Sequence, residues 1–204
     1  MADKKATRDA GSSAEEAHRN PSLIPELLAT LGSKSTARFK AAKELSLIAK
    51  DAPDLLYPHF DTFAALLDSP SSVLLWNGLI ILGQLSTVDS ERRFDTIFDR
   101  YFSHLWDGKL VTAANVVSGS GAIARARPEM ADRVITEILN IDQISLPTDE
   151  CHEVIRGEAL LAFGDCIEVA KGDARVTEFT RRCLESTRPA TRKKAEDLLN
   201  RLGI

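Results

Sequence analysis

Residues 36–49 read TARFKAAKELSLIA, and this stretch decides the fold because four later stretches repeat its pattern. The four relatives are SVLLWNGLIILGQLS (72–86), VTAANVVSGSGAIA (111–124), VIRGEALLAFGDCI (154–167) and TRKKAEDLLNRLG (191–203). Counted from Arg38, equivalent positions follow at spacings of 37, 38, 43 and 36 residues, and the position three residues later is small in four of the five copies. Self-similarity at a period near 37 residues predicts stacked copies of one helical unit.

A second apolar segment with helical spacing precedes each copy. These segments cover residues 21–31, 54–67, 91–105, 128–139 and 174–185. Pro53 and Pro128 stand at or near the expected helix starts, where a missing amide donor costs little. No stretch shows the alternation of a strand bounded by turn dipeptides. The sequence therefore predicts an all-α chain of about five helical hairpins.

The chain divides into a polar start and one continuous array. Residues 1–20 contain hardly any large apolar side chain, so we expect a flexible polar tail there. Residues 21–204 are expected to form a single domain, because one hairpin cannot cover its own apolar stripe and must stack on its neighbours. The expected repeats are about 21–53, 54–90, 91–127, 128–173 and 174–204.

The aligned segments resemble the HEAT and armadillo families of α-solenoids over residues 21–204. The period, the recurring small residue and the helix end Leu82-Gly83-Gln84-Leu85-Ser86 carry the resemblance. It implies a right-handed α-solenoid whose second helices line a concave, partner-binding surface. In these families an Asp in the turn is often supported by an Arg. Asp68 and Asp107 match the Asp, and Arg38, Arg156 and Arg192 match the Arg, but no repeat clearly has both.

The third copy has an unusual run, SGSGA at residues 118–122. Each glycine inside a helix costs roughly 0.8–1 kcal/mol relative to alanine. Two explanations remain open: close packing against a neighbouring repeat, which we favour, or a bound segment that approaches the helix backbone.

Charge is unevenly distributed along the 204 residues. Basic and acidic side chains number 9 and 6 in residues 1–50, 9 and 20 in residues 51–173, and 8 and 4 in residues 174–204. The acidic middle repels phosphate, so it favours a basic protein or peptide over a nucleic acid as the partner. No apolar stretch is long enough for a membrane span or resembles a secretory signal, so we expect no membrane association and a cytoplasmic protein.

The sequence contains no set of residues that amounts to an active site. His59, His104 and His152 fall in separate repeats, and no two histidines have the spacing of a helical metal site. Cys166 falls on an apolar position, and Cys183 follows Arg181 and Arg182, which gives it the better electrostatic case for a thiolate. We expect reduced cysteines, no metal, no cofactor and no catalytic activity.

The candidate binding residues are Trp76, Asn77 and Asn115, which lie at equivalent places on two successive second helices. The resemblance implies that such asparagines could hold the backbone of an extended peptide, as in armadillo-type proteins. The alternative is that they form hydrogen bonds between neighbouring helices. The leading hypothesis is a non-catalytic scaffold that binds a protein or peptide on its concave face.

Two other functions stay open. A nucleic-acid binder would use a basic patch at Arg188, Arg192 and Lys193, in the manner of the alkylated-base DNA glycosylases built from HEAT-like repeats; the competing explanation is a polar cap on the last repeat. An enzyme-accessory protein such as the bilin lyases, which share these repeats, is the least supported because no pocket residues can be named.

Overall fold

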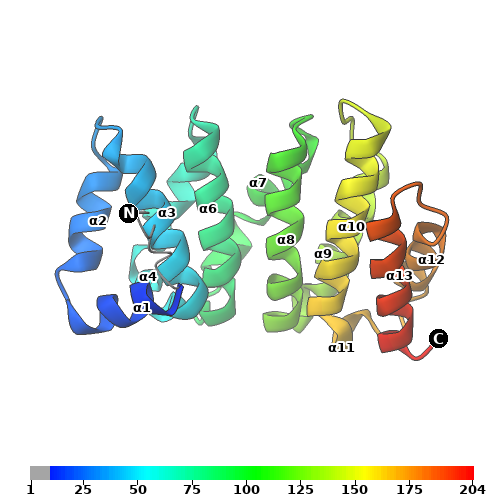
Figure 1. Cartoon of the computed structure of the whole chain (residues 1–204). Coiled ribbons are helices and arrows are strands. Elements are labelled where there is room, and N and C mark those ends of the chain that lie inside the picture. The colour runs from blue at the N-terminus through cyan, green and yellow to red at the C-terminus, as the bar shows by residue number, and fades with distance from the viewer. Residues whose placement is uncertain (1–9) are drawn as a thin grey trace, which may run out of the picture.

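The computed structural model describes residues 10–204, which form a row of helices two layers deep (Figure 1). No strand occurs within this range, so the prediction of an all-α solenoid is confirmed. The front layer consists of the second helices, which pack side by side in chain order. They are α3 (Ala37–Asp51), α6 (Ser72–Leu85), α8 (Leu110–Ala126), α10 (Asp149–Asp165) and α13 (Pro189–Leu202).

The first helices of the last four units form the layer behind and are broken into short pieces. The segment before α6 contains α4 (Pro53–Leu56), η1 (Tyr57–His59), α5 (Phe60–Ala64) and η2 (Ala65–Asp68). The segment before α8 contains η4 (Arg93–Thr96), α7 (Phe98–Ser103) and η5 (His104–Trp106), and follows the short turn η3 (Ser86–Val88). The segment before α10 contains η6 (Pro128–Met130), α9 (Ala131–Leu139) and η7 (Asn140–Asp142). The last contains α11 (Ile167–Ala170) and α12 (Ala174–Cys183). Each of the last four units thus begins with a short extra turn of helix.

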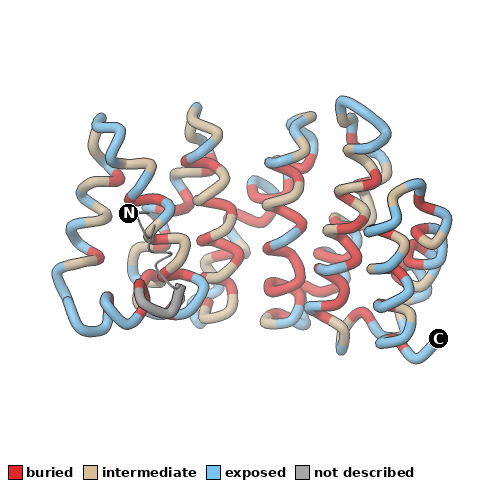
Figure 2. Tube along the Cα trace, in the orientation of Figure 1, coloured by how far each residue is buried: buried red, intermediate tan, exposed pale blue. Residues whose placement is uncertain are grey.

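The core runs without interruption along the row, between the two layers (Figure 2). The aligned apolar positions supply much of it: Leu45, Leu82 and Phe163 occupy the same place in three second helices and are fully buried. Because the buried apolar side chains of successive units belong to one cluster, each repeat completes the core of its neighbour.

The prediction of a flexible tail over residues 1–20 is wrong for Ala10–Arg19, which form helix α1; residues 1–9 lie outside the described range. Helix α1 packs on α3. Ala14 and Ala17 are buried in this contact, and the Ser13 hydroxyl donates to the Glu44 carboxylate at 2.7 Å. Helices α1 and α2 (Leu23–Leu31) together cover the end of the row.

Close packing explains the two glycines of α8, so the favoured interpretation is confirmed. A Cβ on Gly119 would meet the Tyr101 hydroxyl and the backbone of Gly83 on α6. A Cβ on Gly121 would lie 2.5 Å from the backbone oxygen of Ala162 on α10. Both glycines are buried, and no surface is left there for a bound segment.

The Asp–Arg pairing implied by the family resemblance occurs in one repeat, through a residue that the sequence did not single out. The Arg156 Nε donates to Asp142 at 2.8 Å. Asp68 instead pairs with Arg100 of the next repeat at 3.1 Å, and the Arg192 guanidinium donates to the backbone oxygen of Ser186.

An Arg–Asp ladder links the first helices of successive repeats. Four exposed or half-exposed pairs make it up: Arg93–Asp61, Arg100–Asp68, Arg133–Asp99 and Arg175–Asp132, with distances of 2.6–3.1 Å. Exposed pairs of this kind each contribute about 0–1 kcal/mol. The ladder therefore sets the relative positions of the repeats more than it stabilises any one of them.

Candidate functional site: an uncharged strip on the second helices

Two adjacent second helices present a face almost without charge. Helix α6 contains no charged residue, and α8 contains only Arg125, in its last turn. On their solvent side lie Val73 and Val111, whose exposed fractions are 41% and 49%. We call the exposed side of α6 and α8 the central strip; its members are Val73, Trp76, Asn77, Val111 and Asn115. In a chain with 27% charged residues, an uncharged exposed face is a candidate contact surface.

The two asparagines adopt the same geometry on successive helices. The Asn77 amide nitrogen donates to the Val73 backbone oxygen at 2.7 Å, and that of Asn115 donates to Val111 at 2.9 Å. Each bond stays within its own helix, so the interpretation that these amides join neighbouring helices is not what the structure shows. Within residues 10–204 neither amide oxygen accepts a hydrogen bond, so both remain available as acceptors.

Trp76 lies half-buried between the two helices of the strip. Its indole N–H donates to the Thr112 hydroxyl on α8 at 3.0 Å, and Thr112 is fully buried. This bond fixes the indole ring in the seam between α6 and α8. Trp76 therefore links α6 to α8 within the central strip.

Trp106, which the sequence did not single out as a binding residue, is the last residue of η5 and is 51% exposed. A bulky aromatic side chain exposed this far is common where proteins contact one another. Trp106 lies outside the repeated segments, so the repeat alignment did not point to it. The turn that follows it could be predicted from the dipeptide Asp107-Gly108, in which Gly108 adopts φ +70°.

The proposed basic patch is largely engaged within the protein. The Arg188 Nε donates to Glu150 at 3.0 Å, and Arg192 donates to the Ser186 backbone oxygen at 2.6 Å. Lys193 is exposed. The basic last repeat thus neutralises acidic side chains of the repeat before it, which leaves fewer free cations for phosphate.

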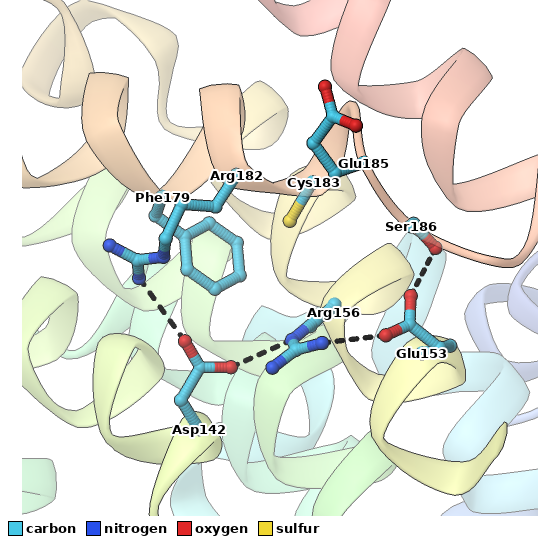
Figure 3. Close-up of a pocket in the computed structure, with 8 residues that line it drawn as sticks. All are labelled: Asp142, Glu153, Arg156, Phe179, Arg182, Cys183, Glu185 and Ser186. Atoms are coloured by element: carbon cyan, nitrogen blue, oxygen red, sulfur yellow. Dashed lines mark hydrogen bonds and ion pairs between the residues drawn. The ribbon is translucent and has the colours of Figure 1, made fainter. Parts of the chain in front are cut away.

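A second candidate site lies where α10, α12 and η7 meet, in a cavity of about 270 Å³ (Figure 3). Asp142 bonds to both Arg156 and Arg182, and Glu153 bonds to both Arg156 and the Ser186 hydroxyl. Burial lowers the pKa of Arg156, but the hydrogen bond to Asp142 outweighs it, and the pKa lies above its ordinary value. These polar groups satisfy one another, so the cluster joins the last two repeats.

The cysteines do not provide a reactive site inside the protein. Cys166 and Cys183 are buried, and burial raises the pKa of Cys166 to about 11 and that of Cys183 to about 12. The expectation that Cys183 has the better case for a thiolate is therefore wrong, because desolvation outweighs the opposing effect of Arg156.

We predict that one of the three thiols reacts in the native protein. Cys151 is half-buried in the first turn of α10 and should react rapidly with an aromatic disulfide reagent at pH 8. Cys166 and Cys183 should react only after unfolding in guanidinium. The Cys151→Ser variant serves as the control and should lose the fast phase. Rapid reaction of that variant would contradict the buried placement.

Two further properties of the described part of the chain bear on function. Across residues 10–204, no three His, Cys, Asp or Glu side chains are placed to hold a metal ion. Every helix in the same range is too short or too polar to cross a membrane.

Solved structures that resemble this one in fold include an engineered protein and an armadillo-repeat protein. A crystal structure of an engineered protein matches with a TM-score of 0.55 and 16% identity, over 97% of this chain and 93% of that one. The armadillo-repeats-only protein of Plasmodium falciparum matches with a TM-score of 0.50 and 15% identity, over 98% of this chain and 100% of that one. No protein-family model and no curated protein matches the chain. The likeness confirms the predicted fold.

Proposed function

We propose that this armadillo/HEAT-type solenoid is a non-catalytic cytoplasmic scaffold that binds an extended segment of another protein along the central strip. The observation that carries the proposal is the repeated valine–asparagine pair, with the same amide geometry on α6 and α8. Two equal contact points on adjacent helices suit a ligand that is itself repetitive, and the backbone of an extended peptide is such a ligand.

The chemistry of the strip fits this ligand. The oxygens of Asn77 and Asn115 can each accept a backbone N–H, and the exposed valines offer apolar contact beside them. Packed helices lie about 8–10 Å apart, and an extended chain advances about 3.3 Å per residue. Successive asparagines would therefore meet backbone groups about three residues apart.

The alternatives have less support. Nucleic-acid binding through Arg188, Arg192 and Lys193 would require the first two to leave partners within the protein. For an enzyme-accessory role like that of the bilin lyases, the most enclosed cavity is lined by the charge cluster of Figure 3, and the groups of that cluster are already paired.

Selection from a random 12-residue peptide library displayed on phage tests the proposal. The protein should enrich a defined pool, and the Asn77→Ala/Asn115→Ala variant should retain about a fifth of it or less, since two lost hydrogen bonds amount to about 1–3 kcal/mol. Asn200→Ala is the matched control, because Asn200 is an exposed asparagine on α13 outside the strip. Equal retention by the double variant and the control would refute this binding face.

A further inference from the structure

The helix next to the central strip carries exposed positive charge. On α3, Lys40 occupies the position equivalent to Asn77 and Asn115 in the repeat alignment, and Lys43 occupies the position equivalent to Ile80. Both lysines are exposed. The uncharged face therefore gives way to a cationic one as the row passes from α6 to α3.

The lysines at the position of Lys40 in the repeat alignment have different surroundings at the two ends of the second-helix layer. On α13 the equivalent residue is Lys194, which pairs with Glu158 of α10 at 3.2 Å. On α3, by contrast, neither Lys40 nor Lys43 forms an ion pair with any residue of the range 10–204. The charge is thus neutralised at one end of the layer, whereas at the other end no carboxylate of residues 10–204 pairs with it.

The carboxylates nearest to Lys40 do not remove this difference. Glu16 and Glu44 line a groove of about 250 Å³ together with Lys40. The Glu44 carboxylate accepts the Ser13 hydroxyl of α1, and no ion pair joins Lys40 to either glutamate in the described structure. Lys43 lies outside the lining of this groove.

We infer that the strip selects a segment with a definite polarity: an uncharged run over α8 and α6, followed at the α3 end by one or two carboxylates that meet Lys40 and Lys43. This inference rests on the proposed function. The acidic excess of residues 51–173 had favoured a basic partner. No acidic residue lies on α6 or α8, however, so that excess does not act along the strip.

Helix spacing sets the expected pattern in the ligand. The axes of α3 and α6 should lie about 8–10 Å apart, which an extended chain covers in about three residues. The first carboxylate should therefore follow the residue that contacts Asn77 by about three positions. The uncharged run should cover about six residues, enough to pass over α6 and α8.

The same phage library tests the inference through charge reversal. Pools enriched on the wild type should place Asp or Glu at one end of an uncharged run. Pools enriched on Lys40→Glu/Lys43→Glu should replace these with Lys or Arg. The matched control is Lys171→Glu/Lys193→Glu, which reverses two exposed lysines elsewhere and should leave the acidic end unchanged. Unchanged melting curves would show that the variants fold.

The outcomes separate the inference from the proposed function. One outcome is that the asparagine double variant loses the pool enriched on the wild type, while the lysine-reversed variant enriches peptides with the same end residues as the wild type. That outcome would overturn the polarity and leave the proposed binding face intact. No enriched pool on the wild type would overturn both.

An affinity cycle with one selected peptide gives the magnitude. Replacing one Asp or Glu of the peptide by Asn or Gln should weaken binding to the wild type by up to about 5-fold at low salt, because an exposed ion pair contributes up to about 1 kcal/mol. The same replacement should have no effect on, or should improve, binding to the lysine-reversed variant. Only the acidic peptide should lose affinity as salt rises. Equal losses on both proteins would overturn the inference.

Discussion

Gly121→Val is expected to destabilise the protein by about 2–3 kcal/mol, a typical cost of inserting atoms into a packed contact. The Cβ would lie 2.5 Å from the backbone oxygen of Ala162 and 2.8 Å from the Cβ of Asp165. Both atoms belong to α10, so relief requires the whole helix to move away from α8. Thermal melting should show a lower Tm by roughly 5–10 °C for a chain of this size.

Ser118→Val is the matched control for this substitution. It places the same β-branched side chain in the same helix, but Ser118 is exposed. Its effect should stay within about 0.5 kcal/mol. If Gly121→Val and Ser118→Val had the same Tm, that result would contradict the close approach of α8 and α10.

Arg127→Met is expected to cost about 3 kcal/mol, because it leaves a buried carboxylate without its counter-charge. The Asp89 side chain is fully buried, and the Arg127 Nη1 donates to it at 2.8 Å. Asp89 also accepts the Tyr57 hydroxyl and the backbone N–H groups of Arg93 and Phe94. These remaining donors place the cost at the lower end of the range for broken buried pairs. Urea unfolding measures it.

Arg133→Met is the matched control, because Arg133 also pairs with an aspartate of the preceding repeat, at 3.1 Å. That pair is exposed, with 56% and 95% of the two side chains accessible. Its loss should cost no more than about 1 kcal/mol. Equal destabilisation by the two substitutions would contradict the distinction between a buried junction and a surface ladder.

The cost of Arg127→Met should also depend on pH. Burial raises the pKa of Asp95, but hydrogen bonds from Arg127 and Arg92 outweigh it and lower the pKa below its ordinary value. The hydrogen bond from Arg127 likewise lowers the pKa of Glu129. Stability from such carboxylates is present above their unfolded pKa, near 4, and disappears as pH falls through the folded pKa. The difference between wild type and variant should therefore shrink below about pH 4.

The second helices could be predicted from the sequence because their apolar positions recur at one period and are buried in one shared core. The segment 72–86 matches α6, and the segment 111–124 lies inside α8. A residue that must fit two adjacent repeats is restricted in size and polarity, so its period is visible along the chain. The small residues Gly78 and Gly119 belong to the same pattern of close approach.

The first helices and the junctions were harder to predict because long-range contacts define them. The expected helix from residue 91 begins instead with η4 at Arg93, where Asp89 caps the backbone and Arg92 adopts φ +58°. The pairing of Asp89 with Arg127 joins residues 38 positions apart, which no local pattern reveals. Helix α1 could not be predicted because its buried residues are alanines and a serine, which do not produce a periodic pattern of large apolar side chains.

The candidate site was only partly predictable. Trp76, Asn77 and Asn115 were found because the repeat alignment places them on one face. The hydrogen bonds of the two amides, and the absence of charge around them, depend on which side of each helix faces solvent. The cationic end at Lys40 and Lys43 was hidden because net charge per segment does not distinguish paired side chains from free ones.

The two layers hold the repeats together by different forces, which makes the solenoid mechanically asymmetric. The second helices touch through buried apolar and glycine contacts that salt does not weaken, whereas the Arg–Asp ladder of the first helices is exposed and screened by ions. A rise in ionic strength should therefore make it easier to spread the first helices apart, while the contacts between the second helices change less. The separation of the first helices then becomes an elastic property that the surrounding electrolyte adjusts.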